Sequence, residues 1–345
     1  MAREDRSVEL ANQIIEKLEA GVIPWRSVYG NGRTEGGEVH IVANPANVVS
    51  LHPYEGRNYL SALTCLGLNG WTSGWFATFK QWQQNDCMVR RGERSMSVLS
   101  WREIQVGVDP ITGQPEMEWV QRWFNVFNIQ QVEPLSDKGR RFLETNREII
   151  KNPVTMERTP LREVDQYGEP YVQLPMLDRI PATIGCNIEL DVKYTEAQYD
   201  AATDTIFMPP MNKFVSSNAY YTTLLHECVH ATMKQDRCAR YPEVITPTEE
   251  VRAREELIAE FACMLLADKF GTVAIYLDNH AGYIQHWIRA LQAEPKYLKD
   301  IMGDAVKAQR FILKALGVGN GRTAELEAGD TADQRAEGEA ERVPA

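Results

Sequence analysis

The five residues His226-Glu227-Cys228-Val229-His230 constrain this chain more than any other feature of its sequence. Residues four apart lie on one face of an α-helix, so the two imidazoles can point their nitrogens at one metal ion. The surrounding segment, residues 221–233, carries an opposite stripe of apolar side chains, which is typical of an amphipathic helix. The run therefore predicts a helix that holds two metal ligands on one face.

Glu227 projects beside the two histidines, where water on a bound metal would lie. Its carboxylate can take a proton from that water during attack on a peptide carbonyl, while Zn²⁺ acts as a Lewis acid. A chance match is the alternative, and with six histidines in 345 residues its probability is roughly one per cent. The helical context lowers it further, so the sequence predicts a zinc-dependent peptidase centre with Glu227 as the general base.

A catalytic zinc usually has three protein ligands, and the segment Glu255-Glu256-Leu257-Ile258-Ala259-Glu260 offers the third. Glu256 is the predicted ligand, because Glu260 then lies one turn away, where it can hydrogen-bond a ligand histidine and fix its tautomer. Glu255, Glu260 and Asp236 remain alternatives for the third ligand. A solvated helix face would also explain this run of charges, but the interleaved apolar residues favour carboxylates that face inward.

Other side chains in this half leave the remaining roles of the site open. His280 and His286 could each be a ligand or a hydrogen-bond donor to the transition state, although a histidine near aromatic residues more often packs. Tyr220, Tyr221 and Tyr283 could equally supply the donor to the oxyanion, and their spacing does not choose among them.

Asp204 to Met208 alternates weakly in hydropathy and stops at Pro209-Pro210, which cannot donate to a sheet ladder. The pattern predicts an edge strand. Its unpaired backbone groups could pair with an extended peptide substrate, or the strand could simply be the edge of a hairpin.

The order of elements predicts an α+β protein with two domains. Seven of the eight tryptophans precede residue 135, which indicates a mixed α/β N-terminal domain over residues 1–135, beginning with a helix over 7–20. Residues 136–175 are a predicted connecting region. Residues 176–318 form the predicted metallopeptidase domain, with a small sheet and active-site helices, and residues 319–345 a predicted acidic, disordered tail. The expected strands of that domain span 182–190 and 204–208, and its helices 217–234, 249–269, 281–291 and 297–316.

Composition limits the compartment and the partners. The formal net charge of −11 means that any nucleic-acid binding has to come from a local patch. Six scattered cysteines without a disulfide framework favour a reducing compartment. No signal peptide is evident, and no stretch reaches the roughly 20 apolar residues of a membrane span. The expectation is a soluble, cytoplasmic protein with no membrane partner.

One segment of the first half combines aromatic and basic side chains. Trp75, Phe79 and Lys80 precede a turn that contains Arg90, Arg91 and Arg94. Rings that stack on bases, beside cations that follow phosphates, are typical of single-stranded DNA binding. The competing interpretation is that these aromatic residues belong to the core.

Several runs together resemble the ArdC family of plasmid and phage antirestriction proteins, over most of the chain. In the second half they are Tyr199-Asp200, 204–210, Tyr220-Tyr221 leading into His226-Glu227, 254–260 and 280–287. In the first half they are 21–25, 44–58, 78–81, Arg91-Gly92-Glu93 and 124–128. The sequence departs from the family pattern at Cys228, where leucine is usual, and in its acidic tail.

This resemblance implies a single-stranded DNA-binding domain joined to a zincin-like domain, in a bacterial protein that protects incoming DNA from restriction in the recipient cell. It adds Trp25, Arg57 and Asn58 to the candidate DNA contacts. The protein substrate is unknown. Two alternatives remain: a DNA-binding shield whose zinc site is structural or inactive, and an accessory protein related to plasmid primases or injected phage proteins. The metallopeptidase half makes the primase interpretation less favoured.

Overall fold

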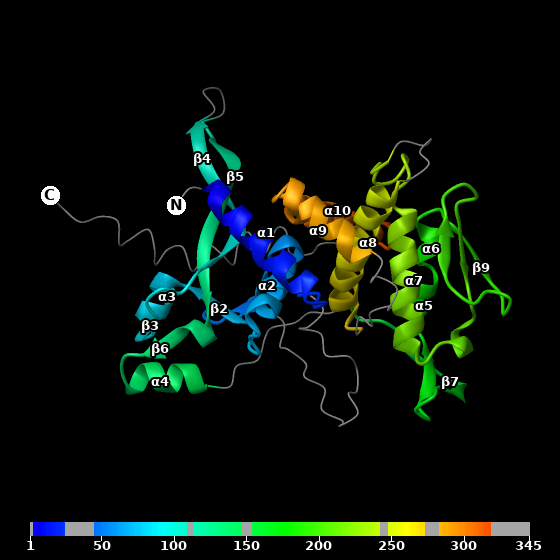
Figure 1. Cartoon of the computed structure of the whole chain (residues 1–345), viewed down its shortest axis with the longest axis horizontal. Helices are drawn as coiled ribbons and strands as arrows, with labels where there is room; N and C mark the ends of the chain where they lie inside the picture. Colours follow the sequence, from blue (N-terminus) through cyan, green and yellow to red (C-terminus); the bar gives the residue numbers. More distant parts are fainter. Residues whose placement is uncertain are drawn as a thin grey trace. The chain divides into compact units, whose positions relative to one another are not determined.

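The computed structural model describes residues 3–24, 45–108, 113–145, 154–241, 248–272 and 283–318. Contacts between residues divide the chain into two compact units (Figure 1). Unit 1 comprises Met1–Val42, Glu55–Thr72 and Lys151–Val318, and unit 2 comprises Ala43–Tyr54, Ser73–Ile150 and Gly319–Ala345. The mixture of helices and strands confirms the expected α+β class, but the units interleave along the chain and do not divide it once, near residue 135.

Unit 1 is mainly helical. Its helices are α1 (Arg3–Glu19), α2 (Gly56–Asn69), α5 (Pro175–Asp178), α6 (Ile180–Thr183), α7 (Ser217–Ala231), α8 (Glu249–Phe270), α9 (Ile284–Ala293) and α10 (Tyr297–Ala315), with a 3-10 turn η2 (Met211–Lys213). The helices α7 to α10 correspond to the four that the sequence predicts after residue 217. Their ends differ from the predicted ones by a few residues.

Helix α8 is the centre of unit 1, and α2, α7, α9 and α10 all pack against it. Its first turn is capped by the Thr248 hydroxyl, which accepts from the Val251 N–H, and Glu249 and Glu250 favour the positive end of the helix dipole. It ends where Gly271 adopts φ 61°, a conformation that suits glycine. Most residues between Ala253 and Phe270 are buried, so α8 is a core helix with little room for exposed charge.

The small sheet of unit 1 has the strand order β10-β11-β9, with β9 (Asn187–Leu190), β10 (Gln198–Asp200) and β11 (Thr205–Met208). β11 pairs antiparallel with β10 and parallel with β9, so the prediction that residues 204–208 form an edge strand is wrong. The two prolines end β11 without exposing its edge. The predicted strand over 182–190 is also wrong at its start, because Ala182 and Thr183 belong to the helix α6, whose first turn contains Pro181, and Gly185 turns the chain at φ 77°.

A hairpin of β7 (Thr159–Val164) and β8 (Pro170–Gln173) joins unit 1 just before the small sheet. It is tied to the start of α7, because the Ser217 hydroxyl accepts from the Val172 N–H and the Tyr171 hydroxyl donates to the Phe214 carbonyl. The sequence predicts only a connecting region here. Alternation is too weak over these residues to distinguish a hairpin from a loop.

Unit 2 is built on a four-stranded sheet of order β1-β2-β5-β4. Its elements are β1 (Ala46–Asn47), β2 (Trp75–Thr78), α3 (Phe79–Gln84), β3 (Cys87–Val89), β4 (Met96–Val108), β5 (Pro115–Asn128), η1 (Ile129–Gln131), β6 (Val132–Pro134) and α4 (Asp137–Glu144). β4 and β5 form a long antiparallel ribbon that continues beyond the sheet (Figure 1).

Trp82 anchors the core of unit 2. It is fully buried, donates its indole N–H to the Phe127 carbonyl at 3.2 Å, and meets Phe142 of α4 edge-to-face. Helix α4 lies in the predicted connecting region, yet it is part of this core. A close approach requires Gly139 there, since a Cβ would lie 2.1 Å from the Asp86 carbonyl oxygen.

No helix in the described part of the chain has both the length and the apolar character that crossing a membrane requires. Residues 319–345, the predicted tail, lie outside the described residues, as do Trp25 and His280.

Candidate metal centre

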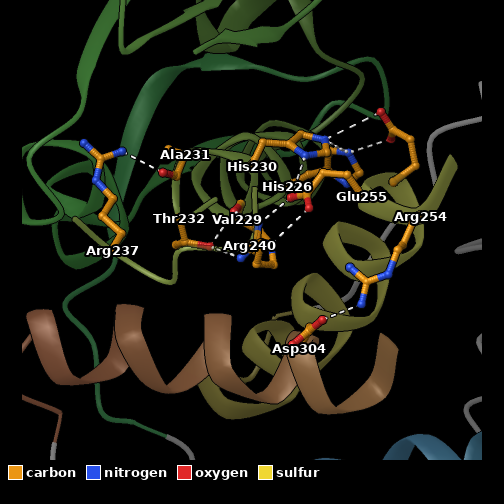
Figure 2. Close-up of polar contacts among 11 residues, drawn as sticks. His226, Val229, His230, Ala231, Thr232, Arg237, Arg240, Arg254, Glu255 and Asp304 are labelled. Atoms are coloured by element: carbon orange, nitrogen blue, oxygen red, sulfur yellow. Dashed lines mark hydrogen bonds and ion pairs between the residues drawn. The ribbon is translucent and has the colours of Figure 1, made fainter. Parts of the chain in front are cut away.

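Helix α7 holds the two histidines because its N-terminus is capped and its body is buried. The Ser216 hydroxyl accepts from the Ala219 N–H, and every residue from Ala219 to Ala231 is buried. His226 and His230 lie one turn apart on the face that meets α8, with rings 4.7 Å apart at 83° (Figure 2). The helix and the four-residue spacing predicted from the sequence are both present.

Three donor atoms from two helices converge at this point. The Nε2 atoms of His226 and His230 are 3.0 Å apart, and the Glu256 carboxylate oxygens lie 3.3 Å from His226 Nε2 and 3.7 Å from His230 Nε2. Tetrahedral zinc with bonds of about 2.0–2.1 Å places its ligand atoms about 3.3 Å apart. The donor atoms of the three residues lie within 4.8 Å of one another, near the spacing of ligands around one zinc ion, and they form the one group of this kind among the described residues.

The charges at the site also suit a cation. Burial raises the pKa of Glu256, but hydrogen bonds and charge interactions with His226 and His230 outweigh it, so the net shift is strongly downward. Burial lowers the pKa of His230, but its hydrogen bonds with Glu255 and Glu256 outweigh that effect and the net pKa is raised. A buried carboxylate held ionised between two imidazoles is an environment that favours positive charge.

Glu227, the predicted general base, follows His226 on α7 and is 6% exposed. Its charge helps to raise the pKa of His230. Glu260 lies one turn after Glu256 on α8 and is 4% exposed. Its hydrogen bond to a ligand histidine stays a prediction. Asp236, an alternative third ligand, is exposed in the loop after α7.

The partner of His230 is a residue that the sequence offered only as an alternative ligand. Glu255 Oε1 lies 3.4 Å from His230 Nδ1, and both Glu255 oxygens accept from the guanidinium of Arg240 (Figure 2). Sequence analysis did not identify Arg240 at all. It stands in a non-helical segment without periodicity, ten residues after His230, so no local signal connects it to the histidine.

The structure separates the other candidate histidine and tyrosines. His286 Nε2 lies 3.2 Å from Glu249 at the start of α8, outside the ligand group. The Tyr221 hydroxyl donates to Asp178 and accepts from the Leu174 N–H, and Tyr220 packs between Phe214 and Tyr221. Tyr283 differs, since burial and then the charge of Glu256 raise its pKa. Of these three tyrosines, only Tyr283 has a pKa that responds to a metal-ligand candidate.

The candidate DNA contacts belong to both units. Arg57 and Asn58 lie on α2 in unit 1, whereas six candidates lie in unit 2: Trp75, Phe79, Lys80, Arg90, Arg91 and Arg94. Trp75 packs against the core of unit 2, which favours the competing interpretation that this ring is a core residue. Phe79 is 44% exposed, and Arg91 and Arg94 are exposed. Arg90 is paired with Glu93 at 2.8 Å.

Two family models match the chain. Residues 4–132 match the N-terminal domain of anti-restriction factor ArdC, and residues 175–301 match the zincin-like metallopeptidase MPTase-PolyVal. The second match contains α7, α8 and all three candidate ligands.

Two solved structures of the antirestriction protein ArdC from plasmid R388 are similar. The metal-free structure has a TM-score of 0.57 and 24% identity, covering 90% of this chain and 97% of that one. The Mn(II)-bound structure has a TM-score of 0.59 and 23% identity, covering 92% of this chain and 99% of that one. At these identities the likeness establishes a common fold.

Three relatives match by sequence over 88% of this chain. Two are DNA primases TraC of Escherichia coli, 29% and 28% identical, of which this chain spans 27% and 19%. The third is the uncharacterized protein y4eC of Sinorhizobium fredii (strain NBRC 101917 / NGR234), 28% identical over 88% of its length. Because a match of this extent includes both halves, the metallopeptidase half is not a feature that separates the chain from proteins named as primases.

Proposed function

Because the chain is an ArdC-type protein, with an ArdC N-terminal domain followed by a zincin-like metallopeptidase domain, we propose that it is an antirestriction protein with a zinc-dependent peptidase centre. The convergence of His226, His230 and Glu256 carries the proposal, together with Glu227, which follows His226 in the chain. A structural zinc needs four protein ligands and no general base, whereas three ligands and a neighbouring carboxylate suit catalysis.

In this mechanism His226, His230 and Glu256 hold the ion. Zinc bound there supplies Lewis-acid polarisation of the substrate carbonyl and lowers the pKa of water. Glu227 takes the proton as the water oxygen adds to the carbonyl carbon, and it then delivers that proton to the leaving nitrogen as the C–N bond breaks. Tyr283, which precedes α9, is the proposed donor to the developing oxyanion, because the Tyr221 hydroxyl is engaged by Asp178 and Leu174 and Tyr220 packs between Phe214 and Tyr221.

β11 is paired with a strand on each side, so it has no free edge for an extended protein substrate. The edges of the small sheet are β9 and β10, and β10 also packs on α7. We therefore assign pairing with an extended peptide to β10. The identity of the protein substrate is not specified by any of these contacts.

Single-stranded DNA binding is the second part of the proposal. The exposed ring of Phe79 and the exposed cations Arg91 and Arg94 in unit 2 support it, as does the family of this N-terminal domain. Stacking of bases on an exposed ring contributes about 1–3 kcal/mol per base, and arginines add attraction to phosphates.

Glu227→Gln tests the peptidase assignment, because it keeps the shape of the side chain and removes the base. We expect zinc content to stay unchanged while hydrolysis of a peptide library falls by about 100-fold or more. Asp236→Asn, which neutralises an exposed carboxylate near α7, is the matched control and should behave as wild type.

The same variant distinguishes a second candidate function, that of a DNA-binding shield with an inactive zinc site. A cell that expresses Glu227→Gln should lose protection of incoming unmodified DNA if hydrolysis is the mechanism. Undiminished protection would favour the shield. The similarity to the TraC primases over both halves supports a further alternative, an accessory role in DNA transfer. In that case neither the wild type nor Glu227→Gln would protect incoming DNA from restriction.

A further inference from the structure

We propose that Arg240 is a positioning residue of the metal centre: it clamps Glu255 against the end of α7 so that His230 presents Nε2 to the metal. The inference rests on the metal site of the proposed function but not on peptide hydrolysis. It concerns a residue within sixteen positions of every ligand, yet outside both metal-binding helices.

The guanidinium of Arg240 joins the two helices directly (Figure 2). On the α8 side, Nε donates to Glu255 Oε2 at 3.0 Å, and Nη2 donates to Glu255 Oε1. On the α7 side, Nη1 donates to Thr232 Oγ1 at 2.7 Å and Nη2 donates to the Val229 carbonyl at 3.0 Å. The Arg240 and Glu255 side chains are only 3% and 6% exposed, so solvent does not replace these bonds.

The contacts on α7 are made where a helix needs a cation. The last carbonyls of a helix lack partners within it and carry partial negative charge. Arg240 meets that end at Val229, one residue before His230. It thereby fixes the last turn of α7, the turn that carries the second histidine.

Glu255 transmits this position to the imidazole. Its Oε1 lies 3.4 Å from His230 Nδ1, so it accepts the Nδ1 proton and leaves Nε2 with the lone pair that binds metal. Because Arg240 engages both Glu255 oxygens, the neighbouring Glu256 is the carboxylate that turns to the metal.

The segment between α7 and Arg240 is shaped to return the chain to the helix. The Cys238 N–H donates to the Thr232 carbonyl at 2.9 Å and the Arg240 N–H to the Met233 carbonyl at 3.1 Å. Ala239 adopts φ 49°, an unusual conformation for a residue with a Cβ. The surrounding bonds hold this turn, which is typical of a segment with a defined role.

Arg237 provides a matched control from the same segment. Its side chain is also 3% exposed and also contacts the end of α7, donating to the Ala231 carbonyl at 2.7 Å. Its acidic partner, however, is Asp204 before β11, at 3.0 and 2.6 Å, rather than a residue of α8. If Arg240 only stabilises the end of α7, its replacement should affect zinc binding no more than replacement of Arg237. If Arg240 positions His230, its replacement should weaken zinc binding more.

The experiment compares Arg240→Gln, Arg240→Lys and Arg237→Gln in the full chain. Zinc affinity is measured by competition with a chromophoric chelator, and ligand geometry by the visible absorption of the Co²⁺-substituted proteins. We expect Arg240→Gln to weaken zinc binding about 10–100-fold and to alter the cobalt spectrum. Losses of this size are typical when the hydrogen-bond partners that orient a metal ligand are removed. Arg237→Gln should retain the affinity and the spectrum of the wild type.

Arg240→Lys covers the case in which Arg240→Gln does not fold. An ammonium retains the charge but cannot bridge Glu255, Thr232 and Val229 together, so an altered cobalt spectrum supports the proposal and a wild-type spectrum and affinity overturn it. Equal losses in the Arg240 and Arg237 variants also overturn it. A wild-type protein that binds no zinc refutes both this inference and the proposed function. A wild type that binds zinc without hydrolysing peptides refutes the peptidase alone.

Discussion

Replacing Glu256 with glutamine tests the third ligand while preserving the size of the side chain. The carboxylate lies 3.3 and 3.7 Å from the two imidazole Nε2 atoms, and its strongly lowered pKa keeps it ionised at neutral pH. Glutamine offers only a neutral amide oxygen to the metal. Removing a hydrogen-bond partner of a metal ligand weakens metal binding up to about 100-fold. Loss of the charged ligand itself should weaken zinc binding by at least this factor, which corresponds to about 2.7 kcal/mol of binding free energy.

The expected effect on stability follows from linkage. At free zinc about 100 times the wild-type Kd, zinc raises the free energy of unfolding by about 2.7 kcal/mol. With a Kd about 100-fold weaker, the same zinc raises that of Glu256→Gln by only about 0.4 kcal/mol. The assay is urea unfolding followed by far-UV circular dichroism, with and without zinc, beside chelator competition.

A matched control is Glu189→Gln, which neutralises an exposed carboxylate on β9 and should leave zinc binding unchanged. The ligand assignment is refuted if Glu256→Gln keeps the wild-type affinity. It is equally refuted if Glu260→Gln, one turn further along α8, weakens zinc binding more than Glu256→Gln does.

Three further predictions concern other parts of the molecule. Tyr283→Phe should lower kcat about 100-fold with zinc content unchanged, and an unaltered kcat would remove Tyr283 as the oxyanion donor. Burial raises the pKa of Asp204, but hydrogen bonds from Arg237, Tyr199 and Lys234 lower it overall, so its stabilising effect is present above about pH 4 and is lost as pH falls through the folded pKa. Asp204→Asn should therefore lower the unfolding free energy by about 1–3 kcal/mol at pH 7, with the difference closing in acid, and a pH-independent difference would contradict this. Trp82→Ala should lower the unfolding free energy of unit 2 by about 3–5 kcal/mol in denaturant titrations, because the ring is completely buried. A clearly smaller loss would contradict the role of Trp82 as the anchor of this core.

The metal centre could be predicted from sequence because most of its information is local. The four-residue spacing of His226 and His230 fixes their common face once a helix is established, and Glu256 lies on a second helix with its own apolar pattern. Glu255 and Arg240 could not be assigned, because their roles depend on how α7, its following turn and α8 meet in space. The spacing to Glu260 favours Glu256 as the ligand, but nothing local gives the adjacent Glu255 a role other than that of an alternative ligand.

The prediction that residues 204–208 form an edge strand is right about the strand and wrong about the edge, for a related reason. Residues 204–208 have the alternation of a half-buried strand, and the burial of β11 alternates as expected. Whether a strand is central or at an edge depends on which other segments pair with it, and β9 and β10 have little hydrophobic patterning of their own. The two prolines after Met208 indicate where β11 ends, not which side of it is unpaired.

The two units also change how DNA binding has to be tested. Helices α1 and α2 precede residue 135, but they belong to unit 1, where α1 packs on α9 and α2 packs on α8 and α10. A fragment of residues 1–135 would expose the apolar faces of both helices, at about 1.5–3 kcal/mol for each large side chain such as Ile14, Leu18 or Leu60. Loss of DNA binding by that fragment would report misfolding, so the full chain is required.

In the full chain, Arg91 and Arg90 form a matched pair for a salt series with single-stranded oligonucleotides. Arg91 is exposed, whereas Arg90 is already paired with Glu93 and donates to the Gln130 carbonyl. A cation that neutralises one phosphate contributes about 0.7 to the slope of log affinity against log salt for single strands. Arg91→Gln should therefore reduce the slope by about that amount, and Arg90→Gln by less, because Glu93 already offsets its charge. Equal slopes for the wild type and both variants would exclude Arg90 and Arg91 from the DNA contact and leave the proposal with Lys80 and Arg94.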